Sequence, residues 1–400
     1  MPDVPLSLSR GPDSEEPLHR EERICTNPEK KGKMMNKLKI ALLAAAAVYS
    51  AGAMSAEVYK SDGASLSVYG RVKAEVMNGY GYVDQSLKTD AEDHPGFIGS
   101  ARLGVSGESK VNDFFTAFGN IYYDLSAEDG IDANDRMNVY YGWVGMRFGD
   151  YGELLGGHME PAAYRALAPV DVFEDWGFAG NGASLDLHNT GAANRQDGII
   201  MYQADDLGGS GIGFSVSYRF RDAGDNTKNG VSAGLSYDTP IGLGFTAGYQ
   251  YNKAIDKSVT GDRTETILGA YYGAFGEPGF YGAGVYNHTK LNTGDHMSDD
   301  SVKYCDEDCA FSGDGFDLVA SYTTPEGMFT FTADWGYMKN QWRNSDSDVA
   351  VNQIVGNITW NINEQAQLLV EYVDNFADGE GDAYRDAHQD LLTFGAIYNF

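Results

Sequence analysis

The chain has few cysteines, few basic residues and no long apolar run after its first 60 residues. Only 3 of its 400 residues are Cys, and 29 Lys and Arg accompany 58 Asp and Glu, a formal charge of −29. This acidity excludes a protein that wraps nucleic acid, because such a protein needs a basic face. Without runs of ~20 apolar residues, a bundle of transmembrane helices is excluded as well.

Glycine and aromatic residues are abundant instead. The chain contains 50 Gly, 26 Tyr and 19 Phe, and its Gly share exceeds the usual ~7%. This composition favours short twisted strands over helices. A length of 400 residues suggests two or three domains, but an all-β barrel of this size is commonly one unit.

A basic segment followed by an apolar one lies near the N-terminus. Lys37 and Lys39 precede the apolar run 40–53, and small residues follow it. This order predicts a secretory signal peptide over 34–56, with cleavage after Ala56. A membrane anchor is the alternative, but the run is shorter than the ~20 residues that span a bilayer.

Residues 1–33 precede the expected start of that signal. Met34 or Met35 is a natural initiator, so 1–33 is interpreted as an upstream extension of the reading frame. The exported body, 57–400, keeps 21 Lys and Arg against 51 Asp and Glu, so the acidity belongs to it.

Two cysteines remain in the exported body, Cys305 and Cys309, in the sequence YCDEDC. Export to an oxidising compartment permits a disulfide between them. A metal site is the alternative, but the pair lacks the His residues or second Cys pair that zinc sites need.

Hydrophobic alternation with a period of two begins at residue 65. Val68 and Val72 fall on one face of a strand, whereas Arg71, Lys73 and Glu75 fall on the other. Similar segments recur to the C-terminus and predict about sixteen strands of about ten residues, as in a transmembrane barrel. The predicted strands are 65–77, 99–109, 114–125, 137–147, 152–158, 195–203, 212–221, 230–237, 245–253, 265–272, 279–290, 316–322, 329–340, 350–360, 366–374 and 389–400.

The predicted connections alternate between short links and long acidic loops. The long ones are 78–98, 126–136, 159–194, 291–315 and 375–388. Outer-membrane barrels have short periplasmic turns and long external loops. A sheet in lipid must close to pair its backbone, and sixteen strands enclose an aqueous channel that accepts a charged inner face. The sequence therefore predicts an all-β, antiparallel transmembrane barrel.

Both ends of the exported body carry family-like motifs. The stretches EVYKSDG at 57–63, SVYGR at 67–71, SARLGVSGE at 100–108 and IYNF at 397–400 resemble the general diffusion porins of Gram-negative bacteria. The resemblance covers essentially 57–400. It implies a sixteen-stranded outer-membrane barrel, usually a homotrimer, that passes small hydrophilic solutes passively.

The resemblance also implies a constriction. In this family the third external loop folds into the barrel, and 159–194 lies where that loop belongs. Asp171 and Asp175 match its two acidic positions, and Glu174 adds a third carboxylate. Rings of carboxylates favour cations.

The matching basic positions on the barrel wall are Arg71, Arg102 and Arg195. Tyr140 stands where the family often has another arginine, so the basic side is weaker and a stronger cation preference is expected. Phe400 matches the C-terminal signature that the outer-membrane assembly machinery reads. The implied partners are further copies of the chain, outer-membrane lipid and lipopolysaccharide, that machinery, and small solutes and ions, with no cofactor and no nucleic acid.

Three other functions remain open. A barrel enzyme needs a nucleophile and base, but the histidines lie mostly in predicted loops and no Gly-x-Ser-x-Gly motif places a serine beside them. A sugar-selective porin needs a row of aromatic rings, for which Tyr140, Trp176 and Phe178 give a hint. An adhesive role for the external loops is the third alternative.

Overall fold

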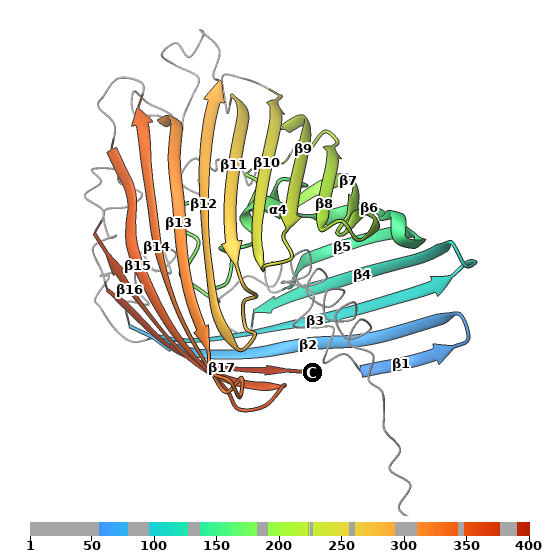
Figure 1. Ribbon diagram of the computed structural model, residues 1–400, viewed down its shortest axis with the longest axis horizontal. Helices are drawn as coiled ribbons and strands as arrows, with labels where there is room; N and C mark the ends of the chain where they lie inside the picture. Colours follow the sequence, from blue (N-terminus) through green and yellow to red (C-terminus); the bar gives the residue numbers. More distant parts are fainter. Residues whose placement is uncertain are drawn as a thin grey trace, which may run out of the picture. The chain divides into compact units, whose positions relative to one another are not determined.

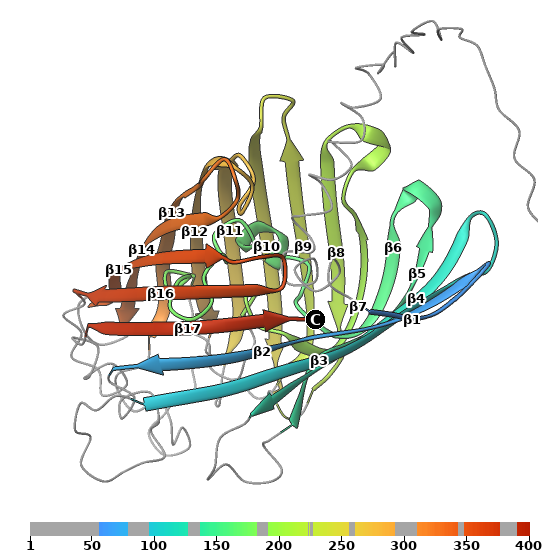
Figure 2. The ribbon, with the colours of Figure 1, turned by 90° about the horizontal axis from the view of Figure 1, so that it is seen from below.

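The computed structural model describes residues 56–78, 96–126, 137–181, 191–222, 224, 227–255, 261–292, 310–342, 348–376 and 390–400. The chain divides into two units, Met1–Leu38 and Lys39–Phe400, and every described residue belongs to the second. Strands make up most of that unit (Figures 1 and 2). No helix in the described ranges is long and apolar enough to cross a membrane.

The strands form one antiparallel sheet that closes on itself. Each strand from β2 onward pairs with the next, and β17 returns to β2. All sixteen predicted strands and the barrel are thereby confirmed. The strands are β2 (Ala64–Met77), β3 (Gly96–Lys110), β4 (Phe115–Ser126), β5 (Met137–Phe148), β6 (Glu153–Met159), β7 (Gln196–Ala204), β8 (Ile212–Arg219), β9 (Thr227–Asp238), β10 (Leu243–Ala254), β11 (Asp262–Tyr272), β12 (Gly279–Asn292), β13 (Ala310–Thr323), β14 (Phe329–Trp342), β15 (Asp348–Asn361), β16 (Ala366–Asn375) and β17 (Leu391–Asn399).

The barrel closes at the C-terminal residue. The Gly70 N–H donates to the Phe400 carbonyl at 2.8 Å, and the Phe400 N–H donates back at 2.9 Å. A Cβ at Gly70 would lie 2.6 Å from the Phe400 ring, so this contact requires glycine. A short strand that the sequence did not reveal, β1 (Ala56–Ser61), pairs with the remaining edge of β2.

The two faces of each strand differ as the alternation predicts. On β10, Phe245 and Tyr249 are each 47% exposed on the outer face, whereas Thr246 and Gln250 are buried on the inner face. An apolar outer face suits lipid, and closure leaves no unpaired sheet edge between β2 and β17.

The connection from β6 to β7, residues 160–195, is called the lumen loop below. It is described for 160–181 and 191–195 and contains the short helix α4 (Tyr164–Leu167). In Figure 1, α4 lies against the inner side of β9, β10 and β11. The lumen loop thus runs inside the barrel, as the resemblance implied for 159–194.

Candidate pore constriction

The outgoing leg of the lumen loop, residues 160–170, packs on the inner wall through apolar side chains. Ala163, Ala166 and Leu167 are fully buried and form one cluster with Ile267 on β11 and Val319 on β13. Burying these side chains, at about 25 cal/mol per Å² of apolar surface, favours the docked loop. The inner wall of the barrel is therefore apolar at this place because the lumen loop covers it.

Backbone contacts fix the same leg. The Ala162 N–H donates to Ser217 Oγ at 3.1 Å, and the Ala163 N–H donates to Ser232 Oγ at 2.7 Å. A Cβ at Gly234 would lie 2.2 Å from the Ala162 carbonyl oxygen, so only glycine permits this approach. The small wall residue lets the loop backbone come close, and the hydroxylated residues accept hydrogen bonds from N–H groups that would otherwise lack partners.

The return leg, residues 176–181, is held by carboxylates of the wall. Three alternate backbone N–H groups donate to side-chain carboxylates on three different strands. The pairs are Trp176 with Glu371 at 2.7 Å, Phe178 with Asp334 at 3.1 Å and Gly180 with Asp317 at 2.9 Å. Sequence reasoning did not assign these acids to the constriction. A carboxylate on the inner face is typical of any water-filled pore, so the sequence does not distinguish one that binds the loop from one that contacts water.

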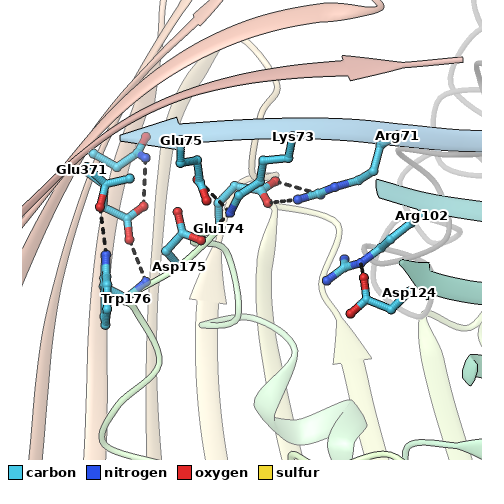
Figure 3. Close-up of polar contacts among 11 residues, drawn as sticks. Arg71, Lys73, Glu75, Arg102, Asp124, Glu174, Asp175, Trp176 and Glu371 are labelled. Carbon is cyan, nitrogen blue, oxygen red and sulfur yellow. Dashed lines mark hydrogen bonds and ion pairs between the residues drawn. The ribbon is translucent and has the colours of Figure 1, made fainter. Parts of the chain in front are cut away.

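The tip of the lumen loop, residues 171–175, reaches β2 (Figure 3). Arg71 Nη2 lies 2.6 Å from Glu174 Oε2. Lys73 pairs with Asp175 and, at 2.8 Å, with Glu75. These ion pairs hold the acidic tip against the wall on this side of the lumen.

The loop carboxyl groups differ in their surroundings. Burial raises the pKa of Glu174, but the adjacent Arg71 outweighs burial and leaves that pKa below its ordinary value. Burial raises the pKa of Asp171, and the hydrogen bond from Tyr164 Oη at 2.5 Å offsets only part of that effect. Glu174 is therefore the more firmly ionised of the two.

Beside Arg71, whose partner in the β2–β3 register is Arg102, two arginines flank one aromatic ring. Arg102 Cζ lies 3.9 Å and Arg195 Cζ 3.7 Å from the centroid of the Tyr140 ring. Arg102 Nε lies 3.3 Å from Asp124 Oδ1, and Arg195 Nη1 lies 3.5 Å from Glu160 Oε1. Each guanidinium is thus held between an aromatic ring and a carboxylate.

The structure brings together most of the residues selected from the sequence. Arg71 meets Glu174, while Asp175 meets Lys73, which sequence reasoning missed as a constriction residue. Lys73 follows Arg71 by two positions on the same strand face, and that spacing was the available signal. Asp171 instead contacts Tyr164 of the loop itself. Arg102, the neighbour of Arg71 across the β2–β3 pair, and Arg195 both contact the Tyr140 ring.

Cys305 and Cys309 lie outside the described residues. In the described part of the chain, no group of three or more His, Cys, Asp or Glu side chains is placed to hold a metal ion.

A closed sixteen-stranded barrel with an apolar outer face and an inserted charged loop defines a channel protein of the bacterial outer membrane. A family model described as Gram-negative porin matches residues 41–380, and the chain belongs to that family. It is therefore an outer-membrane channel protein rather than an enzyme, which removes the first alternative function.

Relatives match over their whole length at low identity. Porin-like protein L of Photobacterium profundum is 26% identical over 92% of this chain and 100% of its own length. Outer membrane porin N of Escherichia coli is 26% identical over 90% of this chain and 99% of its own length.

Solved structures share the fold. Salmonella typhi OmpF in complex with daunomycin matches with a TM-score of 0.71 and 20% identity, over 86% of this chain and 100% of the other. An anion-selective porin from Comamonas acidovorans matches with a TM-score of 0.63 and 18% identity, over 84% and 100%. A fold shared with an anion-selective porin does not fix the ion preference, so that preference must be argued from side chains.

Proposed function

We propose that the chain forms a water-filled, cation-preferring channel for the passive diffusion of small hydrophilic solutes across the outer membrane. The lumen loop narrows the bore, and the solutes pass its acidic tip and the neighbouring Arg102, Tyr140 and Arg195. The narrow segment beside the lumen loop then limits both the size and the charge of the solutes that pass.

The excess of acidic over basic side chains around the constriction supports the proposed cation preference. The carboxyl groups there are those of Glu75, Asp124, Glu160, Asp171, Glu174, Asp175 and Glu371, and the basic groups are those of Arg71, Lys73, Arg102 and Arg195. The four cations are each paired with an acid, so the remaining carboxyl groups attract cations to the extent that they are ionised. The acidity of 57–400 adds to this attraction within a Debye length of ~8 Å at physiological salt.

The aromatic contacts argue against a sugar-selective channel. Guanidinium groups lie over the Tyr140 ring, and Trp176 donates its indole N–H to Thr393 Oγ1 at 3.1 Å. Phe178 packs against the apolar cluster under the lumen loop. None of the three rings is arranged as part of a free row for sugars.

The test is the reversal potential of the refolded 57–400 chain in a planar bilayer under a KCl gradient. The double variant Asp171→Asn/Asp175→Asn is expected to lower the K⁺/Cl⁻ permeability ratio, since it removes two acids and releases Lys73. Asp150→Asn in the turn between β5 and β6 is the matched control, because it removes one exposed carboxylate outside the lumen loop. An unchanged ratio in the double variant would contradict the role of these acids.

We also propose that the channel assembles as a homotrimer in contact with outer-membrane lipid and lipopolysaccharide, and that Phe400 is the residue read by the assembly machinery. Cross-linking in detergent tests the trimer, and deletion of Phe400 tests the signal through the yield of folded barrel. Export with a signal peptide over 34–56, without 1–33, predicts a mature N-terminus at Glu57, which N-terminal sequencing measures.

A further inference from the structure

Tyr140 is the extra residue of a β-bulge. In the pairing of β4 with β5, Tyr122 faces Tyr141 and Tyr123 faces Val139, so Tyr140 has no partner in the register. Because a bulge interrupts the alternation, neighbouring side chains can turn to the same side, and bulges commonly re-aim a side chain near a functional site. Tyr140 and Tyr141 accordingly pack in the same inner cluster.

The ring of Tyr140 lies at the centre of a basic stretch of wall. Arg102 comes from β3, two strands to one side of β5, and Arg195 directly precedes β7, two strands to the other side. Both Cζ atoms lie within 4 Å of the ring centroid, which is van der Waals contact over a ring. Two groups this close cannot share one face, so Tyr140 is sandwiched between the two guanidiniums.

Other aromatic rings fix the orientation of this ring. Tyr140 meets Tyr122 and Tyr141 edge-on, at centroid distances of 5.7 and 5.0 Å. Tyr122 in turn contacts Tyr69 at 5.2 Å, and the three supporting tyrosines are buried. The ring is therefore a rigid support rather than a mobile lining group.

We propose that Tyr140 is a positioning residue that sets ion selectivity by holding Arg102 and Arg195 flat against the wall. A guanidinium is attracted to the face of an aromatic ring. Asp124 pairs with Nε of Arg102 and Glu160 with Nη1 of Arg195, so each guanidinium is held against the wall and away from the axis of the pore. This inference rests on the proposed channel function and explains how the channel keeps two lumen arginines without losing its preference for cations.

Replacing the ring releases the arginines. The loss of an exposed cation–π contact lowers the population of the docked guanidinium about two- to fivefold. In Tyr140→Leu the guanidiniums move toward the axis, and the K⁺/Cl⁻ permeability ratio is expected to fall about twofold. Tyr140→Phe keeps the aromatic face and is expected to retain the parental ratio.

The experiment measures reversal potentials of the refolded 57–400 chain and of these variants in a KCl gradient. The Leu substitution is repeated in a background that carries Arg102→Gln and Arg195→Gln, where it should have no effect on the ratio. If Tyr140→Leu does not fold, Tyr140→Met provides a flexible side chain without a ring face.

Two results overturn the proposal. One is a parental ratio in the folded Leu or Met variant, and the other is an equal change in the background without the two arginines. A ratio in Tyr140→Phe as low as in Tyr140→Leu assigns the effect to the hydroxyl and also rejects it. Absence of any current through the parental protein contradicts the channel function itself, so the two failures are distinguishable.

Discussion

Two neighbouring regions of the constriction, which adjoin where Arg71 pairs with Arg102 in the β2–β3 register, hold their charges by different means. On the tip side, which comprises residues 171–176 and their partners on β2 and β16, acids pair with ammonium, guanidinium and backbone N–H groups. On the arginine wall, formed by Arg102, Tyr140 and Arg195, an aromatic ring separates two cations. The charges of the tip side form the ion pairs and hydrogen bonds that dock the lumen loop. The charges of the arginine wall are stacked on an aromatic ring instead.

We therefore expect the tip side to determine the stability of the docked lumen loop and the arginine wall to determine the ion selectivity of the channel. Substitutions on the tip side should mainly release the loop, and substitutions on the arginine wall should mainly change which ions pass. The three variants below test the first half of that statement, from the largest effect to the smallest.

Lys73→Met should have the largest effect. Lys73 is 8% exposed and lies between Asp175 and Glu75, so its removal leaves the buried Glu75 and the partly buried Asp175 without their cation. Breaking a buried ion pair by removing one partner typically costs about 3–5 kcal/mol. The free energy of unfolding in urea, measured in detergent, should fall by about that amount. Lys73→Arg, which keeps the charge, is the control, and a Met variant as stable as the parent would refute the role of Lys73 in docking.

Glu371→Leu should have an intermediate effect. The Glu371 carboxylate is fully buried and accepts the Trp176 N–H at 2.7 Å and an Asn357 amide N–H at 3.1 Å. Leaving a buried donor unpaired costs about 1–3 kcal/mol. Hydrogen exchange at the Trp176 amide should therefore accelerate about 5- to 150-fold. Glu371→Gln retains an acceptor and should exchange more slowly than the Leu variant, and equal rates in both would count against the acceptor role.

The smallest effect is expected from acid. The pKa of Glu174 is depressed below its ordinary value of 4.5, so its pairing stabilises the docked tip above pH 4.5 and is lost as the pH falls through the depressed pKa. Glu174 is 35% exposed, and solvent screens the pair with Arg71. Current noise from a loosened tip should rise below pH 4.5 in the parent. Arg71→Gln should show this noise already at neutral pH, and identical acid profiles would remove the pair from the explanation.

The same titration sharpens the comparison between the two sides. Neither guanidinium nor phenol groups change charge between pH 3 and 7, as their ordinary pKa values are about 10 or higher. The part of the ion selectivity that depends on stacking against Tyr140 should therefore persist when the tip has loosened. Any fall in the K⁺/Cl⁻ permeability ratio in acid is then expected from the protonation of carboxylates.

The barrel was predictable because its rule is local and repeated. Every strand that faces lipid on one side and water on the other shows alternation, and sixteen such segments were found from the sequence. Strand β1 was missed because all its residues are exposed, so no buried face imposes a pattern. The position of the lumen loop came from a resemblance, since its residues have no period of their own.

The details of the constriction depend on contacts between distant strands. Nothing local distinguishes Asp317 or Asp334 from any other pore-lining acid until Gly180 and Phe178 are placed against them. The bulge at Tyr140 was also hidden, because one extra residue does not alter the apolar and polar pattern enough to reveal a register shift. Arg71 with Glu174 was predictable only through the family pattern.

The contact between Gly70 and Phe400 has a consequence for biogenesis. Because the first long strand and the last residue of the chain complete the same seam, the barrel cannot be sealed until the whole polypeptide has been delivered. A chain cut short by even one strand leaves the facing edges of β2 and β16 exposed, and exposed edges recruit foreign strands. Closure of the barrel therefore depends on β17, and a chain that lacks this strand keeps two unpaired edges.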